Sequence, residues 1–168
     1  MMSDRALAQL ETTTSSSFAC DLAKWHSIMK AYEAGGHAYH ATLPTDGLRK
    51  LAEEMNATRA AGFDAMRNAQ IELGSRVRAV LADAGFKSVA GSGFEAPGVI
   101  VSYTDDPNIQ NGSRFAAAGL QIAAGVPLHC DEPADFRTFR LGLFGLDKLN
   151  NIDRTVANLE KGLAAIKD

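Results

Sequence analysis

The N-terminal third of the chain alternates between helical patterns and short polar segments. Residues 3–10 predict one or two helical turns, and the run of hydroxyl residues at 12–17 predicts a loop, because such residues are poor helix formers. Asp21 is a suitable N-cap for a second helix, and the glycine pair at 35–36 favours its end. A short extended stretch is expected at 37–43.

Two more helices are predicted in the middle of the chain. Pro44 favours the start of the first, and a stripe of apolar residues indicates the face that it buries: Leu48, Leu51 and Met55. We expect a break near Gly62 and then a long amphipathic helix that ends at Gly85. The apolar positions of this helix are Phe63, Met66, Leu73, Val77, Val80 and Leu81.

The second half of the chain changes from helical to strand-like patterning. The segments typical of strands are 86–89, 98–103, 120–122 and 138–143. A short helix is expected at 114–118, and the last helix carries an amphipathic stripe formed by Ile152, Val156, Leu159, Leu163 and Ile166. This order predicts an α+β fold: a helical N-terminal segment joined to a small domain with a mainly antiparallel sheet covered by helices.

Composition places the chain among ordinary globular proteins. Its 168 residues suit one domain or two very small ones, and 46% hydrophobic with 22% charged residues excludes wholesale disorder, collagen and a disulfide miniprotein. The net charge of -3 weighs against a nucleic-acid partner. No apolar run approaches the roughly 18 residues of a membrane span, and no targeting signal is recognisable. These features favour a cytoplasmic protein without a membrane partner.

Cysteine and histidine positions give little support for metal chemistry. Cys20 and Cys130 form no disulfide framework in a chain of this length, and we expect buried or half-buried thiols in a reducing compartment. The run His129-Cys130-Asp131-Glu132 looks like a metal cluster. However, neighbouring side chains of an extended segment point to opposite faces, and the usual spacing of metal ligands is absent. No metal site is predicted, and the role of this run stays open.

Arg140 lies within a predicted strand, between the apolar residues Phe139 and Leu141. Arginine is seldom buried without a partner, because removing its charge from water is costly. Its planar guanidinium group suits bidentate capture of a carboxylate. The alternatives are a surface arginine on an edge strand, or an arginine paired with Asp135 or Asp147. The pattern leaves these interpretations open.

Tyr39 and Thr42 bring two hydroxyl groups just before the helix that begins at Pro44. The N-terminus of a helix favours anions through its free N–H groups and its dipole, so a phosphate site is one interpretation. The other is that Thr42 only caps the helix while Tyr39 packs against its neighbours. The bare pattern favours the second interpretation.

Two segments carry a resemblance to a known family. They read Tyr-His-Ala-Thr-Leu-Pro at 39–44 and Phe-Arg-Leu-Gly-Leu-Phe-Gly at 139–145. In type, order and separation they resemble class V aminotransferases of the alanine–glyoxylate and serine–pyruvate type, which are pyridoxal 5'-phosphate enzymes of fold type I. The resemblance runs from about Ser3 to the end of the chain.

The resemblance implies roles for particular residues. Arg140 matches the arginine that binds the α-carboxylate of the substrate. Tyr39 and Thr42 match residues that reach the cofactor phosphate of the other subunit of a dimer. Residues 1–62 would be the tail of the large domain with the connecting helix, and residues 63–168 the small C-terminal α+β domain.

The resemblance also implies what the chain lacks. The Schiff-base lysine of the family lies upstream of the segment where this chain begins, and no lysine of this chain occupies its context. The run 129–132 stands where many relatives carry a glycine-rich turn near the substrate. We therefore expect no catalytic residue in this chain and no stable binding of pyridoxal phosphate by the chain alone.

The expected function follows from these implied roles. The chain resembles the C-terminal part of a transaminase that moves an amino group from a small amino acid (alanine or serine) to a 2-oxo acid (glyoxylate or pyruvate). Alone it is expected to be inactive, and its expected partner is a second copy of the chain or the missing large domain. The alternative is a non-enzymatic module that binds carboxylates or only oligomerises.

Overall fold

The computed structural model describes residues 2–167, with the side chain of residue 167 excepted. The chain divides into two compact units, Met1–Ala52 and Glu53–Asp168. From the sequence we expected a domain boundary between residues 62 and 63, which separates the tail of a large domain from the small domain. That boundary stays a prediction. In the described part of the chain, no helix is both long and apolar enough to cross a membrane.

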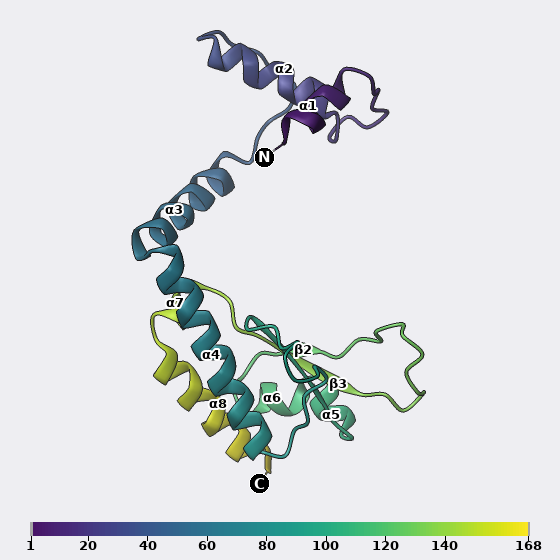
Figure 1. The fold of residues 1–168 in the computed structure, drawn as a ribbon, viewed down its shortest axis with the longest axis vertical. Helices are drawn as coiled ribbons and strands as arrows, with labels where there is room; N and C mark the ends of the chain where they lie inside the picture. Colours follow the sequence, from purple (N-terminus) through teal and green to yellow (C-terminus); the bar gives the residue numbers. More distant parts are fainter. Residues whose placement is uncertain (1, 168) are drawn as a thin grey trace. The chain divides into compact units, whose positions relative to one another are not determined.

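The N-terminal unit is built from short helices and irregular segments (Figure 1). α1 covers Asp4–Leu10 and α2 covers Leu22–Glu33, and the hydroxyl-rich segment between them has no regular structure, as predicted. Asp21 is the N-cap of α2, and its carboxylate accepts a hydrogen bond from the backbone N–H of Lys24 at 2.9 Å. Gly35 follows α2 with a φ of 77°, a left-handed conformation that glycine adopts without strain.

α3 covers Thr45–Ala61 and begins directly after Pro44, as predicted. Its apolar stripe is not buried, which corrects the expectation from its spacing. Leu48, Leu51 and Met55 are 47%, 56% and 61% exposed. The spacing identifies the apolar face of the helix, but α3 contributes no buried residue to the described chain.

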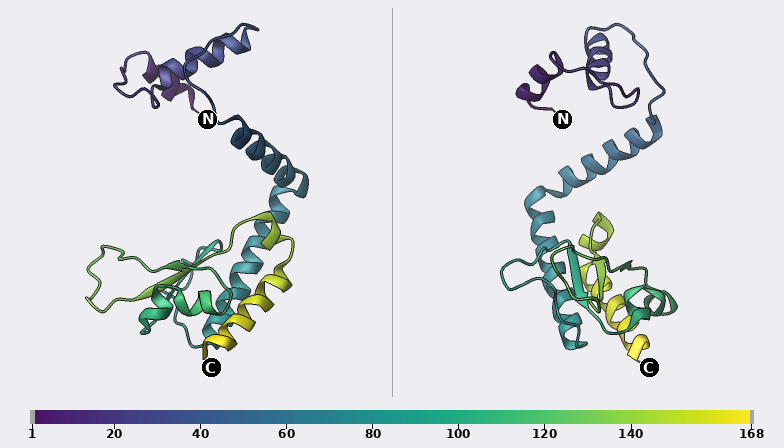
Figure 2. Two further views of the ribbon diagram at one scale, coloured as in Figure 1. Left: turned by 180° about the vertical axis from the view of Figure 1, so that it is seen from behind. Right: turned by 90° about the vertical axis from the view of Figure 1, so that its right-hand side faces the viewer.

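Two long helices lie side by side in the C-terminal unit. α4 covers Phe63–Asp83, and it begins after Gly62, whose φ is 89°. α8 covers Ile152–Lys167 and packs along α4, as Figures 1 and 2 show. An ion pair links them, because the guanidinium of Arg76 lies 2.7 Å from the carboxylate of Asp153.

A three-stranded antiparallel sheet forms the second layer of this unit, in the order β1-β3-β2. Its strands are β1 (Val99–Tyr103), β2 (Ala123–Ala124) and β3 (Thr138–Gly142). β3 is the central strand, so Arg140 lies opposite both Val101 of β1 and Ala123 of β2. Two short helices lie between β1 and β2, α5 (Pro107–Gln110) and α6 (Ser113–Ala117), and a third, α7 (Leu146–Leu149), lies between β3 and α8. The predicted α+β fold is confirmed.

The core lies between the sheet and the long helices. Phe139 of β3 has no exposed surface, and its ring centroid lies 5.0 Å from that of Phe86 and 5.3 Å from that of Phe115. The apolar spacing predicted for the long helices is confirmed for the residues that are buried: Leu73, Val77, Leu81, Val156, Leu159, Leu163 and Ile166. It is wrong for Phe63, at the start of α4, which is 70% exposed.

Two predicted strands are wrong in place or type. Residues 86–89 form only an isolated bridge, between Ser88 and Ser102, and the side chain of Phe86 packs on the core instead. The strand expected at 120–122 occurs at 123–124, because Leu120 and Ile122 pack against the core before the ladder begins. Apolar residues therefore indicated burial at both places, but not the hydrogen bonding of the backbone.

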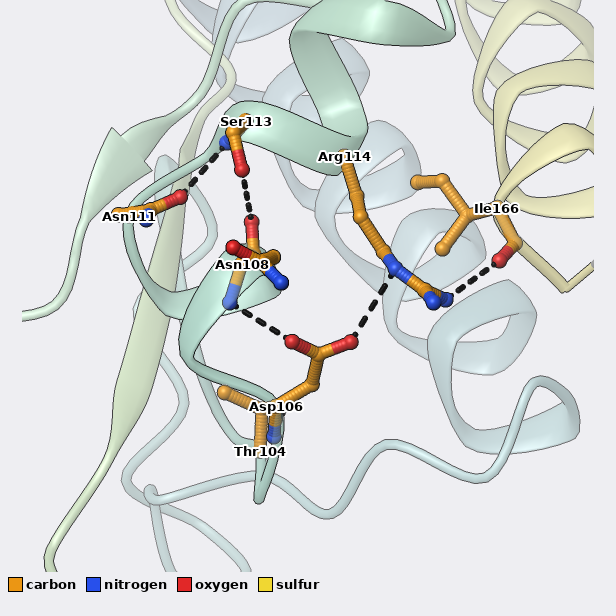
Figure 3. A network of polar contacts seen from close by, with 7 residues as sticks. All are labelled: Thr104, Asp106, Asn108, Asn111, Ser113, Arg114 and Ile166. Carbon is orange, nitrogen blue, oxygen red and sulfur yellow. Dashed lines mark hydrogen bonds and ion pairs between the residues drawn. The ribbon is translucent and has the colours of Figure 1, made fainter.

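A polar network fastens the connection between β1 and β2 to the last helix (Figure 3). Asp106 accepts a hydrogen bond from the backbone N–H of Asn108 at 2.7 Å, and its other oxygen lies 3.2 Å from Nε of Arg114. Arg114 also donates to the carbonyl oxygen of Ile166 at 2.9 Å, close to the end of α8. The network therefore links the start of α5 to α6, and α6 to the end of α8.

Candidate functional site

Arg140 occupies the middle of the central strand β3. Its Nε donates a hydrogen bond to the carbonyl oxygen of Ala124 at 2.9 Å, and the residue is half-buried. This bond attaches the guanidinium group, through its Nε, to the backbone of β2. The alternative of an arginine on an edge strand is wrong, because β3 has a neighbour on each side.

The terminal nitrogens of Arg140 have no acidic partner within residues 2–167. Asp147 pairs with Arg154 instead, at 2.7 Å, and no ion pair joins Arg140 to Asp135 in the described chain. Arg140 is thus a half-buried cation whose two Nη atoms are not engaged by a carboxylate. Such a group can bind a carboxylate through two parallel hydrogen bonds.

Tyr39 and Thr42 lie together in the N-terminal unit. The Tyr39 hydroxyl is 3.3 Å from Oγ1 of Thr42, and both residues are exposed, Tyr39 by 70%. Since α3 begins at Thr45 and the Thr42 hydroxyl contacts Tyr39, neither a helix cap nor a packed tyrosine describes the pair. Together they place two adjacent hydroxyl groups on the surface, where both can form hydrogen bonds with a ligand.

Aromatic contacts position the segment that carries these hydroxyls. The ring of His40 lies 4.4 Å from the ring of Phe18 and 5.0 Å from the ring of Trp25. A ring nitrogen of His40 also lies 3.1 Å from the carbonyl oxygen of Phe18, and the indole N–H of Trp25 donates to the carbonyl oxygen of Ala19 at 2.9 Å. These contacts hold residues 37–43 beside α2 within the N-terminal unit.

The run 129–132 folds around the carboxylate of Glu132. This carboxylate accepts hydrogen bonds from the backbone N–H groups of Leu128, His129 and Cys130, at 2.5, 2.9 and 2.8 Å. These bonds, led by that of Cys130, lower the pKa of Glu132 from 4.5 to about 2. His129 and Asp131 both have left-handed backbone conformations, with φ of 57° and 61°, which are uncommon outside glycine.

This geometry gives the run a structural role that its spacing did not predict. The described residues contain no group of three histidine, cysteine, aspartate or glutamate side chains that could hold a metal ion. Only the density of acidic residues before Pro133 signals a turn in the sequence. The expectation of buried or half-buried thiols is wrong, because Cys20 and Cys130 are both exposed.

Comparison with known proteins identifies the fold. No family model and no curated protein matches the chain. Among solved structures, it is similar to an alanine–glyoxylate aminotransferase from Nostoc sp., with a TM-score of 0.73, 16% identity and coverage of 97% of this chain and 42% of that one. It is also similar to a ureidoglycine–glyoxylate aminotransferase from Bacillus subtilis, with a TM-score of 0.72, 18% identity and coverage of 100% and 43%.

A third similar structure is an aspartate aminotransferase from Thermus thermophilus, with a TM-score of 0.63, 21% identity and coverage of 98% and 43%. The chain therefore has the fold of an aminotransferase portion and spans about two fifths of the length of each of these structures. This coverage fits the C-terminal portion of such an enzyme.

Proposed function

We propose that the chain is the C-terminal portion of a class V, pyridoxal 5'-phosphate-dependent aminotransferase. The complete enzyme would move an amino group from a small amino acid, such as alanine or serine, to a 2-oxo acid, such as glyoxylate or pyruvate. The shared fold supports this proposal. The observation that carries it is Arg140, a half-buried guanidinium on the central strand without a carboxylate partner in residues 2–167.

In this proposal Arg140 binds the α-carboxylate of the amino acid and of the oxo acid. Its Nε is already bonded to the carbonyl oxygen of Ala124, so the orientation of the guanidinium is fixed before a ligand arrives. Fixing the group in advance reduces the conformational entropy that binding would otherwise cost. Half-burial also strengthens the attraction, because less water screens the two charges.

Tyr39 and Thr42 fit a role toward the cofactor phosphate. Phosphate oxygens accept hydrogen bonds, and the two exposed hydroxyls, 3.3 Å apart, can donate to neighbouring oxygens. We infer that they bind the phosphate of pyridoxal 5'-phosphate held by a second subunit. When bound, this cofactor supplies an electron sink for the exchange of the amino group. Since no lysine here occupies the context of the family's Schiff-base lysine, the chain alone is proposed not to transaminate.

Exposed apolar side chains support a partner for this chain. On α2, Met29 and Tyr32 are 60% and 54% exposed, and the stripe of α3 is exposed as well. Such surfaces on a globular protein usually meet another chain or domain. We propose a second copy of the chain or the large domain of the enzyme as that partner, and the cytoplasm as the setting.

Binding of pyruvate and of L-alanine tests the role of Arg140. Titrations followed by amide NMR should give a dissociation constant at least about tenfold higher for Arg140→Ala than for the unchanged chain. Arg154→Ala is the matched control, because Arg154 is already paired with Asp147. Equal affinities for the unchanged chain and a folded Arg140→Ala variant would reject the proposed function.

A further inference from the structure

A single peptide group, between Ala124 and Gly125, connects Arg140 to the end of α5. Its carbonyl oxygen, from Ala124, accepts the hydrogen bond of Nε of Arg140 at 2.9 Å. Its N–H, from Gly125, donates to the carbonyl oxygen of Gln110, the last residue of α5, at 3.3 Å. The group that holds the Arg140 side chain is therefore itself held by a neighbouring helix.

The two hydrogen bonds of this peptide group depend on each other. A peptide group is planar, and in its trans form the C=O and the N–H point in opposite directions. The peptide bonds of the described chain are all trans. The bond from Gly125 to Gln110 therefore sets the direction in which the Ala124 carbonyl points, and this direction leads to Arg140.

The position of Gly125 leaves no space for a side chain. A Cβ atom placed there would overlap the backbone carbonyl oxygen of Thr138 and would lie 2.5 Å from its carbonyl carbon. Thr138 is 1% exposed and pairs with Tyr103 of β1, so its backbone cannot move without disturbing the central strand. The φ of Gly125 is not left-handed, so contact excludes a larger residue here and backbone conformation does not.

An alanine at position 125 would therefore have to move the end of β2 away from β3. The added methyl group is carried by the Cα that is bonded to the nitrogen of the same peptide group, so this group moves with it. Arg140 stays on β3, because pairing with Val101 of β1 also holds that strand. The distance between Nε and the Ala124 carbonyl then increases, and a hydrogen bond weakens steeply beyond its normal length.

We propose that Gly125 is a positioning residue for Arg140. By allowing the end of β2 to lie against the backbone of β3, it keeps the Ala124 carbonyl at Nε and so fixes the guanidinium before the substrate carboxylate binds. A guanidinium that is fixed in advance loses less conformational entropy on binding. This inference rests on the proposed function, because it takes Arg140 as the group that binds the carboxylate.

Gly125→Ala in the full 168-residue chain tests the proposal by NMR. The first measurement is the exchange of the Arg140 Nε–H with water, which should become at least about fivefold faster when the acceptor moves away. The second is the dissociation constant of pyruvate, which should rise about fivefold, the effect of about one hydrogen bond. A folded Gly125→Ala variant in which either quantity is unchanged would overturn the positioning role.

Gly74→Ala is the matched control. A Cβ on Gly74 would also meet a backbone carbonyl oxygen, that of Pro97, but this contact lies on α4 and not beside Ala124. The variant should unfold more easily, yet the exchange of the Arg140 Nε–H and the affinity for pyruvate should match those of the unchanged chain. Equal changes in Gly74→Ala and Gly125→Ala would mean a general loosening of the unit, and the positioning role would be overturned.

If Gly125→Ala does not fold, the unchanged chain supplies the test. Opening of the peptide group breaks both of its hydrogen bonds, so the protection factors of the Gly125 N–H and the Arg140 Nε–H should agree within about threefold. A protected Gly125 N–H beside an unprotected Arg140 Nε–H would overturn the proposal.

Arg140→Ala separates this inference from the proposed function. If Arg140→Ala loses affinity for pyruvate and a folded Gly125→Ala does not, the positioning role is overturned and the proposed function stands. If Arg140→Ala binds pyruvate as well as the unchanged chain, the proposed function fails and the positioning role fails with it. Loss of affinity in both variants, with faster Nε–H exchange in Gly125→Ala, supports the proposal.

Discussion

Arg140 and Arg154 are the same residue type in the same unit, but their partners differ. Arg154 donates to both carboxylate oxygens of Asp147, at 2.8 and 2.7 Å, and so its charge is already compensated. Among residues 2–167, Arg140 has only the carbonyl oxygen of Ala124 as a partner. A hydrogen bond to a neutral carbonyl oxygen does not compensate the positive charge of the guanidinium, so the group still attracts an anion. This difference is why we propose Arg140, and not Arg154, as the residue that binds a ligand carboxylate.

Removing the hydroxyls of Tyr39 and Thr42 should weaken binding of pyridoxal 5'-phosphate. We expect Tyr39→Phe and Thr42→Val each to raise the dissociation constant about fivefold, because each variant loses one hydrogen bond to the phosphate. Fluorescence titration of the chain assembled with its proposed partner, a second copy or the large domain, measures this dissociation constant. Pyridoxal, which lacks the phosphate, is the control ligand, and its affinity should stay constant. An equal change for both ligands would contradict a phosphate-specific role.

The sequence identified Arg140, Tyr39 and Thr42 as candidate site residues, but it did not show which groups surround them. The apolar neighbours of Arg140 in a strand pattern suggested an unusual arginine, whereas the choice between a ligand and Asp135 or Asp147 depended on which carboxylates the fold brings near. Which carboxylates lie near Arg140 depends on the tertiary fold, and therefore on contacts between residues that are far apart in the sequence.

The segment between β2 and β3 should respond to acid. The pKa of Glu132 is lowered to about 2, so the bonds that its carboxylate accepts stabilise the segment above about pH 4.5 and are lost as the pH falls toward 2. Amide resonances of His129 and Cys130 should shift over this interval. Glu132→Gln should produce a similar shift at neutral pH.

Glu95→Gln is the matched control for this effect, because Glu95 accepts a backbone N–H, that of Gly93, in another loop. It should leave the resonances of His129 and Cys130 unchanged. Resonances of these two residues that follow an ordinary carboxyl titration near pH 4.5 would show that the bonds to Glu132 are not formed.

α4 depends on a glycine where it passes the segment before β1. A Cβ atom on Gly74 would lie 2.6 Å from the carbonyl oxygen of Pro97, a backbone atom that the Gln70 side chain also holds, at 3.0 Å. Gly74→Ala should therefore lower the free energy of unfolding by roughly 1–3 kcal/mol. Urea unfolding followed by circular dichroism measures this change.

Gly162→Ala on α8 provides the comparison. There an added Cβ meets the far end of the Leu120 side chain, which can move, and alanine gains helix propensity. We expect Gly162→Ala to destabilise the protein clearly less than Gly74→Ala. Equal effects of the two variants would mean that Pro97 yields as easily as Leu120.

Helices were easier to predict than strands, for a physical reason. The stripes of α4 and α8 report burial and secondary structure together, because a helix satisfies its own backbone. The apolar residues at 86–89 and 120–122 report burial alone, since a strand also needs a partner to pair with. Phe86 and Leu120 pack against the core, but neither belongs to a strand of the sheet. The short helices α5 and α7 span single turns, and their patterns are too short to recognise.

At the level of the whole chain, the exposed stripe of α3 predicts association. The spacing of Leu48, Leu51 and Met55 is that of a buried helix face, yet all three are exposed. Leu51→Lys should shift any self-association measured by sedimentation velocity toward monomer, with at least about a tenfold higher dissociation constant. Phe94→Lys, at an 86% exposed residue outside α3, should not. An unaffected equilibrium in Leu51→Lys would exclude this face as the contact.

The chain has the fold of an aminotransferase portion, and the central claim of the proposed function is that Arg140 binds the carboxylate of the substrate. The NMR signal of the Arg140 Nε–H group, assigned with Arg140→Lys, reports on this role when the chain is titrated with pyruvate. We predict a saturable shift with pyruvate and none with methyl pyruvate, whose carboxylate is blocked as an ester. Equal shifts with both compounds, or no shift with either, would contradict the account.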